Sequence, residues 1–486
     1  MAPDFDNTYV TLPERFYTRQ APVPVADPGL IRVNHDLATL LGIDPAWLES
    51  EEGINTIAGN HLPAGADPIA TVYAGHQFGS FNPRLGDGRA VLLGEVVGTD
   101  GERYDLQLKG SGITPYSRNG DGRAPLGPIL REYLVSEAMA KLGVPTSRTL
   151  AAVTTGEAVY REQRLAGGVL VRVAKSHIRI GTMQYFASIQ DLDGLKLLTD
   201  HVISRHYPEV VDAANPVLAM YQQVSRRVAT LIAHWQSVGF IHGVMNTDNM
   251  LLSGETIDYG PCAFMDGYDS AAVYSSIDHG SRYAYRNQPA IAQWNLACLG
   301  QSLLPLIDAD EAVATAAVQD VLNAFPEDYM NAWHERLRTK FGLTTTEAED
   351  ETLMQDFLDL LESGRHDFTL AFRRLAELAE DGNDVSALFE FPESFTPWLQ
   401  QWRQRCERES VSADNRKAQM QATNPVYIAR NHLVERAIQE AYAGDFTFFH
   451  RLHERLQLPF VFAAEDAELA QPPQPHEVVQ QTFCGT

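Results

Sequence analysis

Near residue 185 the spacing of hydrophobic residues changes from a mainly β-type pattern to a helical one. This change limits the possible folds more than any other feature. Before it, from about residue 70, the sequence is rich in glycine and alternates as β-strands do. The strand pairs that it predicts are 88–97 with 103–110 and 157–162 with 167–174. After it, the pattern is helical. A β-rich part followed by a helical part predicts an α+β fold of two lobes, with a ligand site in the cleft between them.

One helix interrupts the predicted strands, at 128–143. Pro128 suits the first turn of a helix and Gly143 suits its end. Apolar residues spaced four apart make its expected buried face: Leu130, Leu134, Ala138 and Leu142. Later helices are expected at 216–239, 288–306, 311–324, 328–341 and 345–364.

These patterns divide the chain into four parts. The first, 1–70, is an N-terminal extension, expected to be irregular up to about residue 60 apart from a short helix near 36–41. The others are a β-rich lobe at 71–185, a helical lobe at 186–460 and an acidic, proline-rich tail at 461–486.

Composition excludes several classes of protein. The 486 residues include 38 Lys and Arg against 63 Asp and Glu, and a net charge of −25 repels nucleic acids and anionic membranes. We find no run of about 18 apolar residues that would span a bilayer, and no secretion or import signal at the N-terminus. Four cysteines without a CxxC pair make neither a disulfide framework nor a zinc site. We therefore expect a soluble, cytoplasmic protein of the size of an enzyme that binds neither nucleic acid nor membrane.

The segment 84–179 departs from this acidic balance. It carries 14 Lys and Arg against 10 Asp and Glu. Such a local excess of positive charge suggests a pocket for an anion, and chance clustering on a solvated face is an equal alternative.

Motifs inside this segment suit a nucleotide. Gly86, Gly88 and Arg89 belong to a turn before a predicted strand, and glycines let backbone N–H groups approach a phosphate, although such turns more often bind nothing. Lys109 ends the next strand and Glu132 follows on the helix. Protein kinases use this arrangement to position the phosphates of ATP, whereas two surface residues are the simpler interpretation of the pair alone.

Further charged residues support the same interpretation. Arg172 and Arg179 follow the last predicted strand, and a loop with Asp121 and Gly122 precedes the helix. The planar guanidinium group suits phosphate binding through two hydrogen bonds. Each arginine alone is more often a surface residue, but the group together favours a phosphate site.

A second motif lies in the helical part. His242 and Asn249 have the separation found in the kinase catalytic loop, and Asp258-Tyr259-Gly260 stands where kinases have D-F-G. Asn249 and Asp258 are thus predicted ligands of Mg²⁺, which needs few protein oxygens when phosphates supply the rest. His242 is predicted to be structural.

The kinase catalytic aspartate is replaced in this chain. Val244 stands at its position and cannot accept a proton. Either the protein does no chemistry or Asp248 is the base, and a carboxylate that caps a turn is the rival interpretation of Asp248. The order of the motifs predicts a protein-kinase-like fold that keeps nucleotide binding while ordinary phosphoryl transfer is compromised.

Three stretches resemble the selenoprotein O (SelO) family, called YdiU in bacteria: 73–95, 108–139 and 241–260. The resemblance extends over nearly the whole chain. It implies a pseudokinase-like fold that binds ATP flipped relative to kinases, with Mg²⁺ or Mn²⁺. It also implies transfer of AMP to Ser, Thr or Tyr hydroxyls of protein substrates, with release of pyrophosphate.

The resemblance also implies roles for individual residues. Asp248 would be the proton acceptor, Asn249 and Asp258 the metal ligands, and Glu132 the ion-pair partner of Lys109. The positions that would hold ATP are Gly86, Gly88, Arg89, Lys109, Asp121, Gly122, Arg172, Arg179 and Asp258.

Cys484 occupies the place where some members of this family carry selenocysteine. A redox role is one interpretation, and an incidental thiol on a mobile tail is the other. Its partner in a disulfide stays open among Cys262, Cys298 and Cys406.

Three functions remain to be distinguished. The leading one is a metal-dependent protein adenylyltransferase, and the alternatives are a protein kinase with Asp248 as base and a non-catalytic nucleotide-binding pseudokinase scaffold. Val244 argues against the kinase. The retained Lys109, Asn249 and Asp258 argue against the scaffold.

Overall fold

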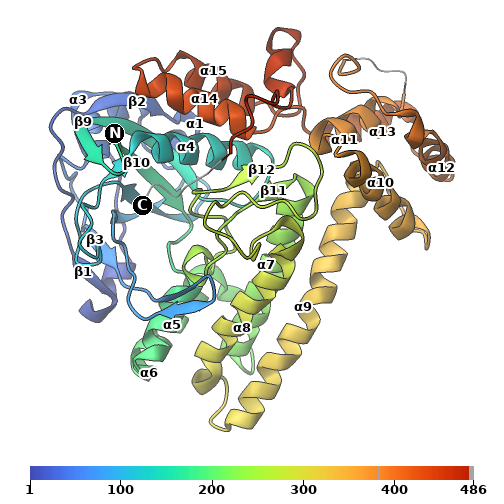
Figure 1. Cartoon of the computed structure of the whole chain (residues 1–486). Helices are drawn as coiled ribbons and strands as arrows, with labels where there is room; N and C mark the ends of the chain where they lie inside the picture. Colours follow the sequence, from blue (N-terminus) through green and yellow to red (C-terminus); the bar gives the residue numbers. More distant parts are fainter. Residues whose placement is uncertain (381–383, 481–486) are drawn as a thin grey trace.

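An antiparallel sheet of eight strands makes up the N-terminal part of the computed structural model, which describes residues 1–380 and 384–480 (Figure 1). Its order is β1-β3-β6-β7-β10-β9-β2, and β8 pairs with β10. The strands are β1 (Tyr17–Arg19), β2 (Gly29–Val33), β3 (Ile69–Thr71), β6 (Ala90–Val97), β7 (Arg103–Lys109), β8 (Ala124–Pro125), β9 (Arg148–Tyr160) and β10 (Arg164–Ala174). Both predicted strand pairs are confirmed, as β6 with β7 and β9 with β10.

The prediction of a mostly irregular segment up to about residue 60 is wrong. Its strands β1 and β2 form the two edges of the sheet, where proline-rich sequence is tolerated because one side of an edge strand needs no ladder hydrogen bonds. Three short helices accompany them: α1 (His35–Leu40), α2 (Pro45–Leu48) and α3 (Glu51–Ala58). Each begins after a side-chain cap, from Asn34, Asp44 and Ser50.

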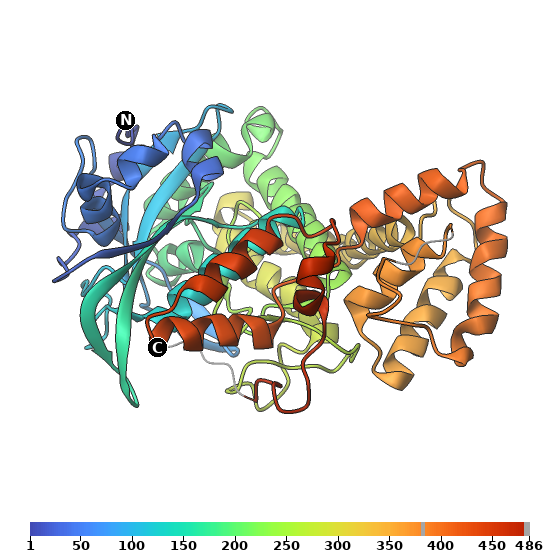
Figure 2. The ribbon, with the colours of Figure 1, turned by 90° about the horizontal axis from the view of Figure 1, so that it is seen from above.

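Helix α4 (Leu126–Lys141) is the predicted helix, and it begins two residues earlier than expected. The four residues of its predicted stripe are all buried. Its other faces are buried as well, because α14 (Asn431–Tyr442) and α15 (Thr447–Leu456) pack on the side away from the sheet (Figures 1 and 2). A helix enclosed in this way can hold a charged residue such as Glu132 away from water.

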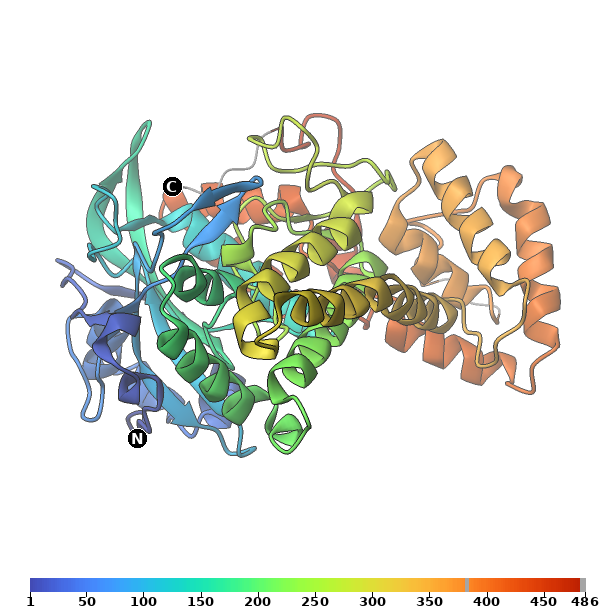
Figure 3. The ribbon, with the colours of Figure 1, turned by 90° about the horizontal axis from the view of Figure 1, so that it is seen from below.

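The remainder of the chain is mainly helical. Its helices are α5 (Ile180–Ser188), α6 (Leu192–His206), α7 (Pro216–Ser237), α8 (Gln288–Ile307), α9 (Glu311–Lys340), α10 (Asp350–Gly364), α11 (Phe368–Glu377), α12 (Thr396–Glu407) and α13 (Ala413–Thr423). Figures 2 and 3 show α10 to α13 as a group on one side of the molecule, at the far end of α9 from the sheet. Two small pairs of strands complete the fold, β4 (Gly75–Gln77) with β5 (Ser80–Asn82) and β11 (Phe240–Ile241) with β12 (Ala263–Phe264).

The long helix α9 corrects the prediction of two helices, 311–324 and 328–341. It continues through Pro326, although proline in a helix interior removes one hydrogen bond and costs about 3 kcal/mol. Phe325 and Tyr329 on either side are buried, and α9 packs along α7 and α8. We attribute the continuity to this tertiary burial, which local sequence does not reveal.

Helix α8 bears on the prediction that the chain has no apolar run long enough to span a membrane. Residues 285–307 are long and apolar enough to cross a membrane by length and composition, contrary to the prediction that no such run exists. Half of that window is buried inside the structure, against α5, α7 and α9. This placement is typical of a core helix.

Candidate nucleotide-binding site

The predicted lysine–glutamate pair forms in the centre of the sheet region. Lys109 ends β7, and its ammonium group pairs with one carboxylate oxygen of Glu132 on α4. The other oxygen accepts a hydrogen bond from Nε of Arg172 on β10, at 2.6 Å. All three side chains are buried. In the antiparallel pairing of β7 with β10, Lys109 lies opposite Leu170, so Lys109 and Arg172 are diagonal neighbours on the same face of the sheet.

Asp258 extends this network to the helical part of the chain. Arg172 donates to one of its oxygens at 2.7 Å and Arg179 donates to the other at 2.8 Å. Asp258 has a φ of 63°, a left-handed conformation that is strained for most residues and that clusters at functional sites. Its side chain is 25% exposed, whereas those of Arg172 and Arg179 are nearly inaccessible. Asp258 thus forms the accessible side of the network.

The electrostatics of the network favour an anionic ligand. Burial lowers the pKa of Lys109 despite the neighbouring Glu132. Burial alone would raise the pKa of Asp258, but Arg172, Arg179 and Lys109 outweigh it and hold that pKa well below its usual value. Within these ion pairs three cations therefore face two ionised carboxylates, a local arrangement that suits an anionic ligand.

Asp248 lies beside this network in the 3-10 helix η4 (Thr247–Asn249). Its backbone carbonyl accepts a hydrogen bond from the Arg179 nitrogen that also binds Asp258, at 2.6 Å. The Asp248 side chain is buried, and burial raises its pKa to about 6. A carboxylate with a raised pKa next to a cationic site suits a general base.

Asn249 is oriented by the residue that replaces the kinase aspartate. Its amide nitrogen donates to the carbonyl of Val244 at 2.9 Å, so its amide oxygen points elsewhere. The described residues hold no cluster of three or more His, Cys, Asp or Glu side chains suited to a metal. Asn249 and Asp258 are oxygen-bearing residues that could hold an ion only if other groups complete its coordination.

The turn with Gly86 and Gly88 also requires its glycines. Gly86 has a φ of 79°, and a Cβ there would lie 2.4 Å from the ring of Tyr116. At Gly88 a Cβ would lie 2.9 Å from a backbone oxygen of the same tyrosine. Arg89 directly precedes β6 and is close to Lys109. Its positive charge contributes to lowering the pKa of that lysine.

The loop with Asp121 and Gly122 is placed differently from the other predicted residues. Asp121 pairs with Arg161 at 2.8 Å, near the turn between β9 and β10, and is 44% exposed. Gly122 has a φ of 66°, and its carbonyl accepts a hydrogen bond from Gly112 at 3.0 Å. The loop touches the glycine turn through Ser117, which donates to the Gly88 carbonyl. No contact joins Asp121 to the network of Lys109 and Asp258 within the described residues.

Two other sequence predictions concern His242 and the cysteines. His242 is fully buried, stacks on Trp235 and bonds the carbonyl of Ile257 at 2.8 Å, as expected of a structural residue. Cys484 lies outside the described residues, so its partner among Cys262, Cys298 and Cys406 stays a prediction.

Sequence reasoning missed the residues that cover Asp248. Gln77 on β4 donates to one of its carboxylate oxygens at 3.1 Å, and Gly75 lies against the other. Tyr73 places its ring under the guanidinium of Arg179, at 4.7 Å. These residues belong to 73–95, a stretch that resembles a known family, but nothing local in the sequence indicated their contacts.

A separate cavity of about 450 Å³ lies at the far end of α5 from Arg179. It contains no titratable side chain and none of the predicted site residues. Its lining residues are Ala187, Gln190, Leu192, Gln301, Ser302 and Pro305. The predicted site residues therefore lie elsewhere.

Comparison with known proteins identifies relatives over nearly the whole chain. A family model described as "Protein adenylyltransferase SelO" matches residues 1–457. A protein nucleotidyltransferase YdiU of Rhodopseudomonas palustris is 55% identical over 99% of both chains. Proteins of the same name from Rhizobium etli and Bradyrhizobium diazoefficiens are each 54% identical over 99% of this chain, and over 97% and 99% of their own lengths.

Proposed function

The chain belongs to the SelO family of protein adenylyltransferases, and from this premise we propose that it transfers AMP from ATP to Ser, Thr or Tyr hydroxyls of proteins, releasing pyrophosphate. Membership makes it a protein nucleotidyltransferase, with a nucleotide as co-substrate and a protein as acceptor. The type of hydroxyl, the orientation of the nucleotide and the roles of individual residues are the parts that we propose.

We propose further that the α+β arrangement is a protein-kinase-like fold of two lobes. The buried pair of a strand lysine with a helix glutamate supports this, because protein kinases hold ATP with such a pair. So does Asp258, which follows the loop with Asn249 and is joined to that pair through Arg172.

The cluster of three buried cations is the observation that carries the proposal. Lys109, Arg172 and Arg179 lie around Glu132 and Asp258, and both arginines contact the partly exposed Asp258. A triphosphate is an anion that such cations bind, and they would stabilise the charge that grows on pyrophosphate as it leaves.

Asp248 would act on the acceptor. Its carboxylate takes the proton of the hydroxyl as the hydroxyl oxygen forms a bond to the α-phosphorus of ATP. The bond from that phosphorus to the bridging oxygen breaks, and its electron pair leaves with pyrophosphate. Val244 offers no second base, so this proton has one nearby acceptor in the loop.

Asn249 and Asp258 would hold Mg²⁺ or Mn²⁺. Asp258 fits this role because it is ionised and partly exposed, and Asn249 because its amide oxygen is left for a ligand. Such an ion supplies charge neutralisation and orientation of the phosphates when bound.

Intact-mass spectrometry after incubation with ATP and Mg²⁺ tests the proposal. We expect the protein, or an unfolded acceptor such as casein, to gain the mass of an adenylyl group. Gain of a phosphoryl group would favour a kinase, and bound ATP without any modification would favour a scaffold. Label from α-labelled rather than γ-labelled ATP should enter protein.

A further inference from the structure

The hairpin of β4 and β5 is docked on the loop that carries Asp248. The backbone N–H of His76 donates to Oγ1 of Thr247 at 2.7 Å, and that of Phe78 donates to Oδ1 of Asn246 at 3.1 Å. Thr247 donates in turn to Gln184 on α5, at 2.6 Å. Two residues of the hairpin are thus fixed to two residues that precede Asp248.

The turn of this hairpin is strained and held in place from outside. Phe78 and Gly79 both have positive φ, 51° and 83°, as a two-residue hairpin turn of this type requires. A bulky residue rarely adopts this conformation, and it persists only where the surroundings impose it. The Phe78 N–H bond and the packing of its ring on Tyr283, at 5.1 Å, provide that constraint.

The docked hairpin places two residues on the carboxylate of Asp248. Nε2 of Gln77 donates to Oδ2 at 3.1 Å. Gly75 lies against Oδ1, and a Cβ at this position would be 2.6 Å from that oxygen. The carboxylate occupies its place only because residue 75 has no side chain.

The two carboxylate oxygens of Asp248 are therefore not equivalent. Oδ2 has a donor, whereas Oδ1 is buried and has no hydrogen-bond partner among the described residues. A buried acceptor without a donor costs free energy and needs an explanation. Rotation of a carboxylate about its last bond is otherwise loose, so a single donor decides how the carboxylate is turned.

We infer that Gln77 is a positioning residue for the transfer reaction: by donating to Oδ2 it fixes the orientation in which the Asp248 carboxylate accepts the proton of the acceptor hydroxyl. This inference rests on the proposed role of Asp248. It assigns to the hairpin a part in the reaction itself, because the docking of His76 and Phe78 sets the place of Gln77.

Gln77→Leu tests the inference, with label from α-labelled ATP into the full-length protein and into casein as the measurement. We expect kcat to fall by roughly ten- to a hundredfold, as for the loss of a hydrogen bond to a charged group. KM for ATP and the calorimetric Kd of ATP should stay within about twofold, because Gln77 contacts none of the cations. An unchanged kcat, or a loss confined to ATP binding, would overturn the inference.

A double-mutant cycle separates positioning from a general structural role. In the Asp248→Ala background, Gln77→Leu should cause no further loss, because its partner is already absent. An equal loss in both backgrounds would show that Gln77 acts without Asp248. Wild-type activity of Asp248→Ala would overturn the proposed base as well, whereas an inactive Asp248→Ala beside a fully active Gln77→Leu would overturn the inference alone.

Two further variants test whether a loss of activity comes from a misfolded hairpin. Ser80→Ala changes the exposed residue opposite Gln77 in the same hairpin and should keep wild-type kcat. Gln77→Asn keeps the amide but is one methylene too short, so it should lose kcat as Gln77→Leu does while binding ATP normally. Wild-type kcat in Gln77→Asn, or a loss in Ser80→Ala equal to that of Gln77→Leu, would contradict the assignment.

Discussion

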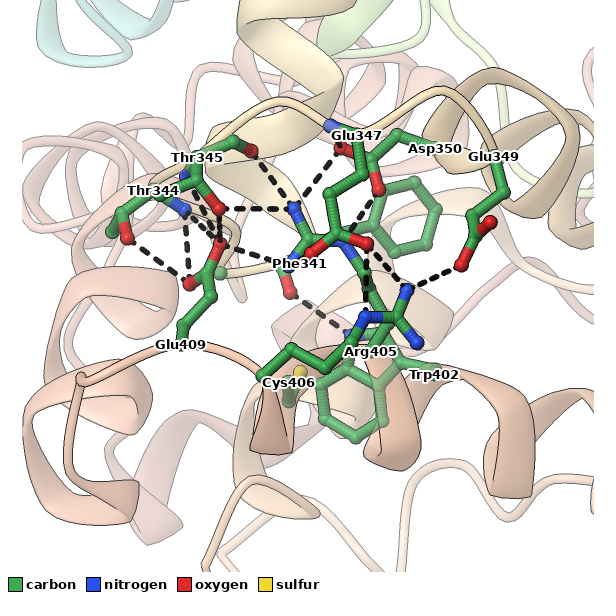
Figure 4. Close-up of polar contacts among 12 residues, drawn as sticks. Phe341, Thr344, Thr345, Glu347, Glu349, Asp350, Trp402, Arg405, Cys406 and Glu409 are labelled. Carbon is green, nitrogen blue, oxygen red and sulfur yellow. Dashed lines mark hydrogen bonds and ion pairs between the residues drawn. The ribbon is translucent and has the colours of Figure 1, made fainter.

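Two of the buried groups of arginines and carboxylates in this molecule are built differently. One surrounds Asp258 in the candidate site. The other surrounds Arg405 on α12, among the helices α10 to α13 (Figure 4). Arg405 binds Asp350 at 2.6 Å and the carbonyl of Thr345 at 2.9 Å, and it pairs with Glu409 at 3.1 Å.

The Arg405 group satisfies its own atoms. Glu409 accepts the backbone N–H groups of Thr344 and Thr345, each at 2.9 Å, and a bond from Arg416 at 3.1 Å. Neither Arg405 nor Glu409 has a buried nitrogen or oxygen without a partner. Such a group fixes how helices meet and leaves nothing for a ligand.

The Asp258 group and the neighbouring Asp248 leave atoms unsatisfied. Nε of Arg179 and Oδ1 of Asp248 are buried without partners among the described residues. Unsatisfied buried atoms next to a partly exposed carboxylate distinguish the Asp258 group from the Arg405 group. If this comparison is right, substitutions in the Asp258 group should change activity, whereas substitutions in the Arg405 group should change stability.

Asp258→Ala should have the largest effect on activity. It removes a proposed metal ligand and leaves Arg172 and Arg179 facing each other. We expect no detectable transfer from α-labelled ATP and loss of the Mg²⁺-dependent part of ATP binding, measured by calorimetry with and without the metal. Retained transfer would mean that the Asp258 group is structural, as the Arg405 group is.

Asp248→Ala should act on rate alone. A general base contributes about a hundred- to a ten-thousandfold, so kcat should fall within that range while the Kd of ATP stays near that of the wild type. Single-turnover labelling and calorimetry measure the two quantities. A large loss of ATP affinity would instead make Asp248 part of the binding site.

Much of the candidate site could be predicted from the sequence because its signals are local. Lys109 ends a strand, Glu132 lies on the next helix, and Asp258 belongs to a short motif with a glycine. The structure joins these three through Arg172, which the sequence suggested only as one cation among several.

The rest depends on contacts between distant residues. Gln77 and Asp248 are 171 positions apart, and no local pattern links them. Pro326 predicts a helix end, and only the burial of Phe325 and Tyr329 on either side explains why α9 continues through it. The edge strands β1 and β2 are short, and only their pairing with β3 and β9 identifies them. Sequence periodicity reports local structure, and these features are decided by tertiary packing.

Arg405→Ala should change stability and leave the chemistry alone. Removing one partner of a buried ion pair leaves the remaining buried charges without a counter-charge, which lowers the free energy of unfolding by about 3–5 kcal/mol. Arg403 on the same helix is exposed, so Arg403→Ala is a matched control that should stay within about 0.5 kcal/mol of the wild type. Denaturant unfolding measures both. Activity per folded molecule should be unchanged, and its loss in Arg405→Ala would break the distinction between the two groups.

The smallest expected effect is the pH dependence of stability that comes from Glu409. Burial would raise its pKa, but the bonds from Thr345, Thr344 and Arg416 outweigh burial and lower it from 4.5 to about 2. A carboxyl with a lowered pKa in the folded state contributes stability above its unfolded pKa and loses that contribution as the pH falls towards the folded value. Wild-type stability should thus fall between about pH 4.5 and 2 by more than that of Glu409→Gln, which lacks the titrating group. Urea unfolding at several pH values measures the difference, and parallel curves would show that Glu409 is not held ionised by its neighbours.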